Sequence, residues 1–189
     1  MEVKKASASA PAIKWALIGL VTSIIITYAL QFLNADPNSA TKYIGLIPFI
    51  AFLLLAQKEY KDQLGGYLTF GEGFVCGFLY AVFLGVLSAV FIYLYYAVLS
   101  PEMLAKLLAS TQSELEKKNP NMTPEQVDQA MAMTSKFLGP ISLSIFSLLG
   151  TLFMGAIVAL VGAAIFKKVR PPFITSADYD DPKPLDPAV

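Results

Sequence analysis

The stretch PISLSIFSLLGTLFMGAIVALVGAAIF, residues 140–166, contains no Asp, Glu, Lys or Arg. Three other long stretches share this property, namely residues 15–33, 43–56 and 73–99. A helix of about 20 apolar residues crosses the hydrocarbon core of a bilayer, where one central charge costs roughly 2.5–3.5 kcal/mol. The 14 basic and 14 acidic residues all lie between or outside these stretches. The sequence therefore predicts an all-α fold with four transmembrane helices.

The domain organisation follows from these stretches. We expect spans at about 14–33, 42–57, 72–99 and 140–166, within a four-span membrane domain that covers residues 14–170. Residues 1–13 are predicted to be a flexible N-terminus. Residues 171–189 hold five prolines and four acids, which predicts a disordered C-terminal tail.

The second stretch predicts a span less strongly than the others. Its 14 apolar residues, 43–56, would reach only about 21 Å, and the hydrocarbon core is about 30 Å thick. A re-entrant segment is the alternative. It would place the C-terminus on the opposite side of the membrane from the N-terminus.

Residues 100–138 are the one sizeable polar segment between spans, and they predict an amphipathic helical hairpin outside the membrane. Ser100 and Pro101 are typical of an N-cap and a first helical position. Asn119-Pro120-Asn121 interrupts the helical pattern, and Thr123 with Gln126 predicts a capping box that restarts it. The hairpin also carries Met103, Met122, Met131 and Met133, for which a docking surface and filler between the helices are both open interpretations.

The positions of Lys and Arg predict the orientation, because positive residues near spans are retained in the cytoplasm. With the N-terminus inside, eight flank the spans on the cytoplasmic side and five lie outside. The eight are Lys4, Lys5, Lys14, Lys58, Lys61, Lys167, Lys168 and Arg170, and the five are Lys42, Lys106, Lys117, Lys118 and Lys136. We therefore expect both termini in the cytoplasm.

The composition argues against most catalytic and metal chemistry. The chain has no His and a single Cys, Cys76, so it holds neither a Cys–His set nor an internal disulfide. Its formal net charge is zero, which gives no attraction to nucleic acid. We expect no metal, no cofactor, no nucleic-acid partner and no enzymatic activity.

Small residues recur at every fourth position in three of the spans, a pattern that permits close approach of helices in lipid. Packing within one four-helix bundle and a dimer face are both open interpretations of this pattern. The candidate packing residues are Gly19 and Ser23 in the first span, Gly73, Gly77, Ala81, Gly85 and Ala89 in the third, and Thr151, Gly155 and Ala159 in the fourth.

Glu72 is the one acidic residue that directly adjoins a span, which makes it a candidate functional carboxylate. It also falls in the first turn of the predicted third span, where a carboxylate complements the positive end of a helix. Both roles remain open from the sequence.

Three motifs give the chain a family resemblance: Gly66–Phe74 before the third span, Ser100-Pro101-Glu102 after it, and Met131–Phe137 before the fourth. With these the chain resembles an uncharacterised bacterial membrane family, the domain of unknown function four-one-nine-nine, over roughly residues 12–170. The resemblance implies a four-span protein of a Gram-negative inner membrane. It implies no activity and no site residue.

The function that we expect from the sequence is that of a structural or accessory membrane protein. It would act by protein–protein association within the lipid bilayer, as a homo-oligomer or with a membrane protein partner. A channel or transporter for a small neutral solute, formed by an oligomer, is the alternative. A membrane enzyme acting on lipid through Glu72 is a third and weaker hypothesis.

Overall fold

The computed structural model describes residues 7–34 and 43–169, and this part of the chain is helical without a strand. The predicted all-α class is confirmed. The predicted disordered tail lies outside the described residues, as does most of the predicted flexible N-terminus. The elements in chain order are α1 (Ser9–Phe32), α2 (Leu46–Gln63), α3 (Phe70–Leu94), the π-helical turn η2 (Tyr95–Leu99), α4 (Pro101–Lys118), α5 (Pro124–Phe137) and α6 (Pro140–Phe166).

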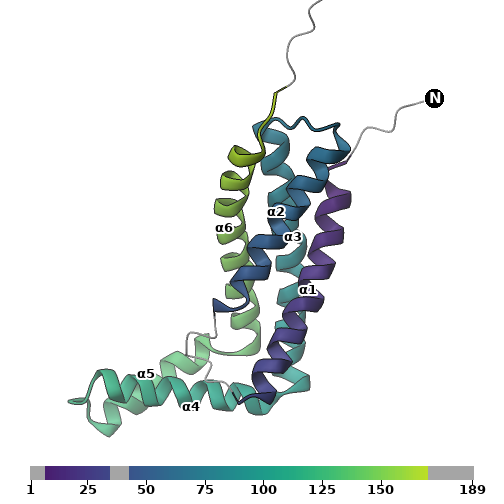
Figure 1. The fold of residues 1–189 in the computed structure, drawn as a ribbon. Helices are drawn as coiled ribbons and strands as arrows, with labels where there is room; N and C mark the ends of the chain where they lie inside the picture. The colour runs from purple at the N-terminus through teal and green to yellow at the C-terminus, as the bar shows by residue number, and fades with distance from the viewer. Residues whose placement is uncertain (1–6, 35–42, 170–189) are drawn as a thin grey trace, which may run out of the picture.

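Helices α1, α2, α3 and α6 form an elongated bundle, and α4 and α5 lie crosswise at one end of it (Figure 1). We call this end the hairpin end. At the other end, the terminal end, α1 begins, α6 ends and residues 64–69 connect α2 to α3. Leu68 and Lys168 exchange two backbone hydrogen bonds of 2.9 Å there, so the α2–α3 connection is fixed to the end of α6.

Three of the four predicted spans are found as long apolar helices, and the second corresponds to the shorter α2. Within the described residues, three helices are long and apolar enough to cross a membrane: α1 with 24 residues, α3 and η2 together with 30, and α6 with 27. The 18-residue α2 runs past the predicted end at 57 and includes Lys58, Glu59, Lys61 and Asp62. Lys, Glu and Gln form helix readily, so the helix continues to Gln63. It ends there because Gly65 and Gly66, directly after the C-cap residue Leu64, adopt positive φ.

Two other helix boundaries also differ from the prediction. α1 begins at Ser9, so residues 9–13 are helical instead of flexible. Pro11 fits there because the first turn of a helix needs no N–H from it. α3 begins at Phe70, where the Thr69 side chain accepts a hydrogen bond from the Glu72 N–H.

The predicted hairpin is confirmed, and its first cap is corrected. Thr123 and Gln126 form the expected capping box, with N–H···O distances of 3.0 and 3.4 Å. Ser100 precedes α4, but its side chain makes no capping hydrogen bond. Its N–H instead donates to the Tyr95 carbonyl at 2.8 Å and closes the π-helical turn between α3 and α4.

The most extensive contact in the bundle joins α3 to α6, which run antiparallel. Four pairs of small residues meet along this contact, which we call the small-residue seam: Gly73 with Ala163, Gly77 with Ala159, Ala81 with Gly155, and Gly85 with Thr151. A methyl group added at Gly155 would overlap the Ala81 side chain, and one added at Gly77 would lie 2.8 Å from the Ala159 Cβ. The backbones therefore approach so closely that larger side chains do not fit.

We predict that Gly155→Ala destabilises the fold and that Gly150→Ala does not. A Cβ at Gly150 meets nothing within 4 Å, so the second change should be neutral or gain up to about 1 kcal/mol from helix propensity. Overpacking at Gly155 should cost about 1–3 kcal/mol. Thermal unfolding of both variants in the same detergent measures the difference, and equal stability would contradict the close approach.

Candidate functional site

A buried glutamine lies at the centre of the bundle, toward the terminal end. Gln57 of α2 is fully buried, and its Nε2 donates hydrogen bonds of 2.9 Å to the Gly73 carbonyl of α3 and the Ala159 carbonyl of α6. One side chain thus joins three helices. Gln57 is not predicted as a site residue from the sequence, because it falls at the last position of the expected second span. The one signal is an amide side chain between the apolar residues before it and the charged residues after it.

Small residues on α3 and α6 make room for this glutamine. A Cβ at Gly77 would lie 2.6 Å from the Gln57 Nε2, and one at Gly162 would overlap the Oε1. Among the residues that the structure describes, the Oε1 itself has no hydrogen-bond partner. It occupies the space that a Cβ at Gly162 would need. The amide is therefore held by its close fit against Gly162 as well as by its two donated hydrogen bonds.

The structure brings some candidate packing residues together and leaves others apart. Gly73, Gly77, Ala81, Gly85, Thr151, Gly155 and Ala159 all lie in the small-residue seam. Gly19 lies against α3, where an added Cβ would be 3.1 Å from the Tyr80 hydroxyl. Ser23 donates a 2.8 Å hydrogen bond to the Gly19 carbonyl within α1. Ala89 is half-buried beyond the end of the seam.

The carboxylate of Glu72 is part of a helix cap. The Thr69 N–H and hydroxyl donate to its Oε2 at 3.0 and 2.8 Å, and the Glu72 N–H donates to the Thr69 hydroxyl oxygen at 3.3 Å. This capping box closes the first turn of α3 at the terminal end. The geometry gives Glu72 a structural role.

A second acidic residue at the terminal end, Glu59, forms hydrogen bonds to another helix. The Glu59 Oε2 accepts hydrogen bonds from the Lys14 ammonium at 2.8 Å and the Trp15 indole at 2.7 Å. The Lys14 hydrogen bond lowers the pKa of the Glu59 carboxyl, partial burial opposes this, and the Trp15 hydrogen bond adds to it. The cluster joins α1 to α2, and Trp15 also stacks on Phe52 with ring centroids 5.7 Å apart.

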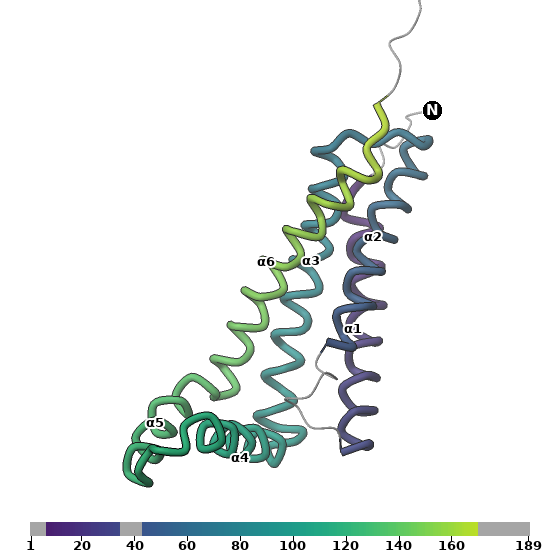
Figure 2. The backbone as a smooth tube through the Cα atoms, turned by 60° about the vertical axis from the view of Figure 1, so that its left-hand side comes forward, coloured from purple at the N-terminus to yellow at the C-terminus, as the bar shows by residue number. Residues whose placement is uncertain are grey.

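Toward the hairpin end the bundle is hollow. α2 begins only partway along the bundle, and Figure 2 shows α6 diverging from α3 toward the hairpin. A cavity of about 620 Å³ opens here between α1, the start of α2, α3 and α6, and we call it the hydroxyl cavity. Its lining residues are Ser23, Thr27, Tyr43, Gly45, Leu46, Phe49, Leu84, Ser88, Phe91, Ile92, Ser147, Gly150, Thr151 and Met154.

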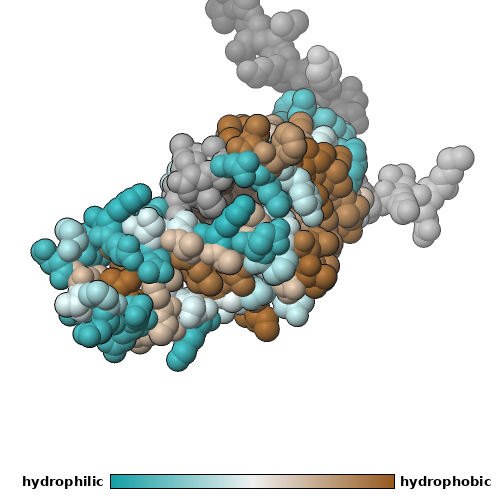
Figure 3. Space-filling model, turned by 90° about the horizontal axis from the view of Figure 1, so that it is seen from below, coloured by the Kyte–Doolittle hydropathy of each residue, from teal (hydrophilic) through white to brown (hydrophobic). Residues whose placement is uncertain are grey.

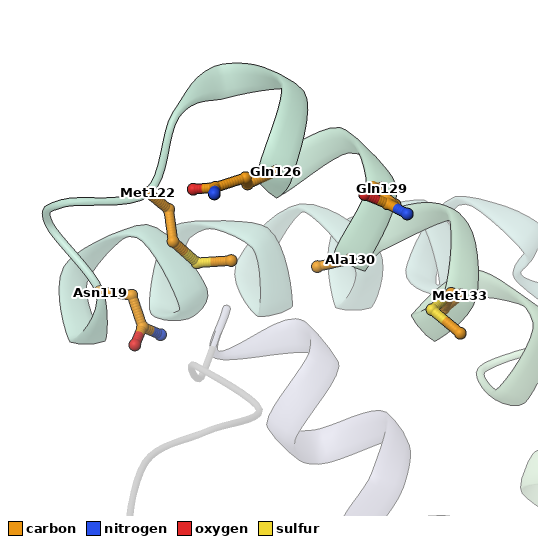
Figure 4. Close-up of a pocket in the computed structure, with 6 residues that line it drawn as sticks. All are labelled: Asn119, Met122, Gln126, Gln129, Ala130 and Met133. Carbon is orange, nitrogen blue, oxygen red and sulfur yellow. The ribbon is translucent and has the colours of Figure 1, made fainter.

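A shallower groove of about 500 Å³ lies on the hairpin. Asn119 and Met122 contribute to it from the α4–α5 connection, and α5 contributes Gln126, Gln129, Ala130 and Met133 (Figure 4). Met133 is 64% exposed, whereas Met103, Met122 and Met131 are half-buried. The methionines therefore divide: Met122 and Met133 line the groove, with Met133 the more exposed of the two, and Met103 and Met131 are half-buried outside it.

Metal chemistry has no visible site in the described part of the chain. Within residues 7–34 and 43–169, no group of three His, Cys, Asp or Glu side chains is placed to hold a metal ion. Cys76 is buried, and its thiol lies 3.5 Å from the Ala56 carbonyl.

We predict that the stability of the bundle depends on the donor group of Gln57. Gln57→Met keeps the length of the side chain and loses two hydrogen bonds, which should cost about 1–3 kcal/mol in total. Gln57→Glu would turn a carboxylate toward two carbonyl oxygens, and an uncompensated buried charge costs roughly 3–5 kcal/mol. Denaturant unfolding at neutral pH should rank the wild type above Gln57→Met and Gln57→Glu last. A Gln57→Glu variant as stable as the wild type would contradict this role.

Comparison with known proteins gives a single positive result. No curated protein and no solved structure matches the chain. The family model described as "Protein of unknown function (DUF4199)" matches residues 14–168. This match runs from Lys14 within α1 to Lys168, just past the end of α6, and includes the seam, the Gln57 site and the hairpin. It spans well over half of the chain and agrees with the family resemblance found in its motifs, so the protein belongs to the DUF4199 family.

Proposed function

We propose that this protein is a four-span protein of a bacterial inner membrane that serves as an accessory subunit, without enzymatic activity. It associates with another membrane protein, or with a second copy of itself, through the α4–α5 hairpin. The observation that carries the proposal is the crosswise hairpin, which projects from an apolar bundle and leaves a methionine-lined groove open.

The outer surface of the bundle supports the membrane placement. α1, α3 and α6 direct large apolar side chains outward along their whole length, among them Val21, Val90 and Phe153, which are 56%, 55% and 72% exposed. Soluble proteins rarely expose such continuous apolar surface. Seen from the hairpin end, the flank of the bundle is hydrophobic and the hairpin largely hydrophilic (Figure 3). Lipid around the bundle and water beyond the hairpin account for both surfaces.

The contacts of α2 support it as the fourth inserted helix. α2 packs against α1, α3 and α6, and its Leu53, Ala56 and Gln57 are fully buried. A re-entrant α2 would return the chain to the hairpin end, but residues 64–69 lie at the terminal end, next to Lys168. This course of the chain supports α2 as a crossing segment over a re-entrant one, although the helix itself is short.

Lysines at the terminal end support a cytoplasmic location for both termini. Lys61 lies over the Phe166 ring at 5.8 Å, Lys168 over the Tyr67 ring at 5.4 Å and Lys14 over the Trp15 ring at 5.2 Å. Amphipathic rings and positive side chains together are typical of a membrane boundary, and the positive side is the cytoplasm. The hairpin end then faces the periplasm.

Labelling of single introduced cysteines tests this orientation. Ser113 of α4 and Asp62 of α2 are both exposed, and the native Cys76 is buried and gives little background. We expect a membrane-impermeant maleimide added to intact spheroplasts to label Ser113→Cys and to leave Asp62→Cys unlabelled until the membrane is opened. Labelling of Asp62→Cys in intact spheroplasts would refute the orientation.

The hairpin is the surface best suited to association. α4 has no buried residue and α5 buries only Val127, so the hairpin contacts the bundle sparsely. The groove combines Met133 with the amides of Gln126 and Gln129. Methionine adapts its shape to a partner and amides supply directional hydrogen bonds, which together suit a protein surface.

We predict that a charge in the groove abolishes association. Met133→Glu introduces one at the exposed methionine, and Ala132→Glu introduces the same charge at the neighbouring exposed position, which is not part of the groove. After mild-detergent purification, the wild type and Ala132→Glu should retain a partner or form a homo-oligomer, and Met133→Glu should lose it. A strictly monomeric, partner-free wild type would contradict the proposal.

A neutral-solute channel, the alternative from the sequence, has less support. Toward the terminal end, the residues that line the hydroxyl cavity stop at Phe49, Leu84 and Met154. Beyond them Leu53, Gln57 and Tyr80 are fully buried, or 0% exposed. Among the described residues of one protomer, no path therefore continues toward the terminal end.

A further inference from the structure

The hydroxyl cavity is lined by polar groups at a depth where apolar ones would be expected. Five serine and threonine side chains from three helices line it, namely Ser23, Thr27, Ser88, Ser147 and Thr151, and Tyr43 lies beside the start of α2. No charged side chain does so among the residues that the structure describes. A cavity of this kind suits an uncharged ligand with a long apolar part and a few hydrogen-bonding atoms.

The hydroxyls divide into two groups by their hydrogen bonds. Ser23 and Thr27 donate at 2.8 Å to the Gly19 and Ser23 carbonyls of α1, as helix hydroxyls commonly do. Ser88, Ser147 and Thr151 make no hydrogen bond to any part of the described chain. These three hydroxyls are half-exposed and retain their donors, although the helices around them are apolar. In a medium without water, such donors are available to an acceptor from outside the chain.

The position of the cavity indicates where that acceptor comes from. Ser88 lies in the second half of α3 and Ser147 in the first half of α6, so both are nearer to the hairpin end than to the terminal end. The wall continues deeper along Ser23, Leu84 and Met154. An acyl chain therefore fits the deeper apolar part, and its ester carbonyl reaches the hydroxyls that lie on the hairpin side of Leu84 and Met154.

We infer that the hydroxyl cavity binds one glycerolipid of the surrounding bilayer, with an acyl chain against Leu84 and Met154 and an ester carbonyl that accepts hydrogen bonds from Ser88 and Thr151. Its volume of about 620 Å³ lies within the usual range of roughly 300–1,000 Å³ for ligand sites. This inference rests on the membrane placement proposed above and is independent of what the hairpin contacts.

The unmodified protein gives the first test. Full-length protein is reconstituted in vesicles that contain equal amounts of an ester-linked phosphatidylcholine and the ether-linked phosphatidylcholine with the same chains. It is then extracted in mild detergent and weighed with its bound lipid by native mass spectrometry. We expect one retained lipid with an ester-to-ether ratio of about two- to tenfold, because one hydrogen bond contributes about 0.5–1.5 kcal/mol. Equal retention of the two lipids, or no retained lipid, would overturn the inference.

Two pairs of variants locate the lipid. Gly150 lines the cavity and an added Cβ there meets nothing, so Gly150→Phe should fill the cavity and abolish retention. Leu149→Phe is the matched control, because Leu149 is 56% exposed and does not line the cavity. Ser88→Ala with Thr151→Val should retain the lipid and lose the preference for the ester.

The controls separate this inference from the proposed function. Retention in Gly150→Phe equal to that in Leu149→Phe would place the lipid elsewhere and refute the site. The cysteine labelling described above reports on the membrane placement by itself, so a correct orientation without a retained lipid would reject the lipid site alone.

Discussion

The close approach of α3 and α6 is the constraint on which the rest of the structure depends. Gly73, Gly77, Ala81 and Gly85 on α3 each meet a small residue of α6, so two helices without complementary charges come into backbone contact. In lipid, apolar side chains gain little by leaving the solvent, and packing between surfaces supplies the association energy instead. A four-residue repeat on both helices is what makes this contact continuous along four turns.

The fit of Gln57 follows from the same seam. The space for its amide exists because Gly77 and Gly162 lack side chains, and its hydrogen bonds end on carbonyls of α3 and α6. Hydrogen bonds between membrane helices contribute only about 0.6 kcal/mol on average. The amide therefore adds specificity more than strength, since it fixes how far α2 is inserted and which face it turns toward α3 and α6.

Much of the fold could be predicted from charge-free stretches, because a charged residue is unfavourable at every position inside a span. The capping box at Thr123 could also be predicted, because its residues are neighbours in the chain.

Three features could not be predicted from the sequence. α2 extends through Lys58 and Glu59 because these residues also favour a helix, although they lie beyond the apolar stretch. The environment of Gln57 depends on residues 16 and 102 positions away. Repeats of small residues show that helices pack closely without showing which helix is the partner, so the pairing of Ala81 with Gly155 required the structure.

The seam also explains why the two halves of the bundle differ. Its last pair is Gly85 with Thr151, and Ser147, one turn nearer the start of α6, lines the hydroxyl cavity. From there α6 diverges toward the hairpin, and α2 does not extend far enough to fill the space. The terminal half is thus tightly packed around Gln57, whereas the hairpin half holds the cavity and ends in a projecting helical pair. This difference agrees with the accessory role proposed above, in which the hairpin half, and not the tightly packed half, meets other molecules.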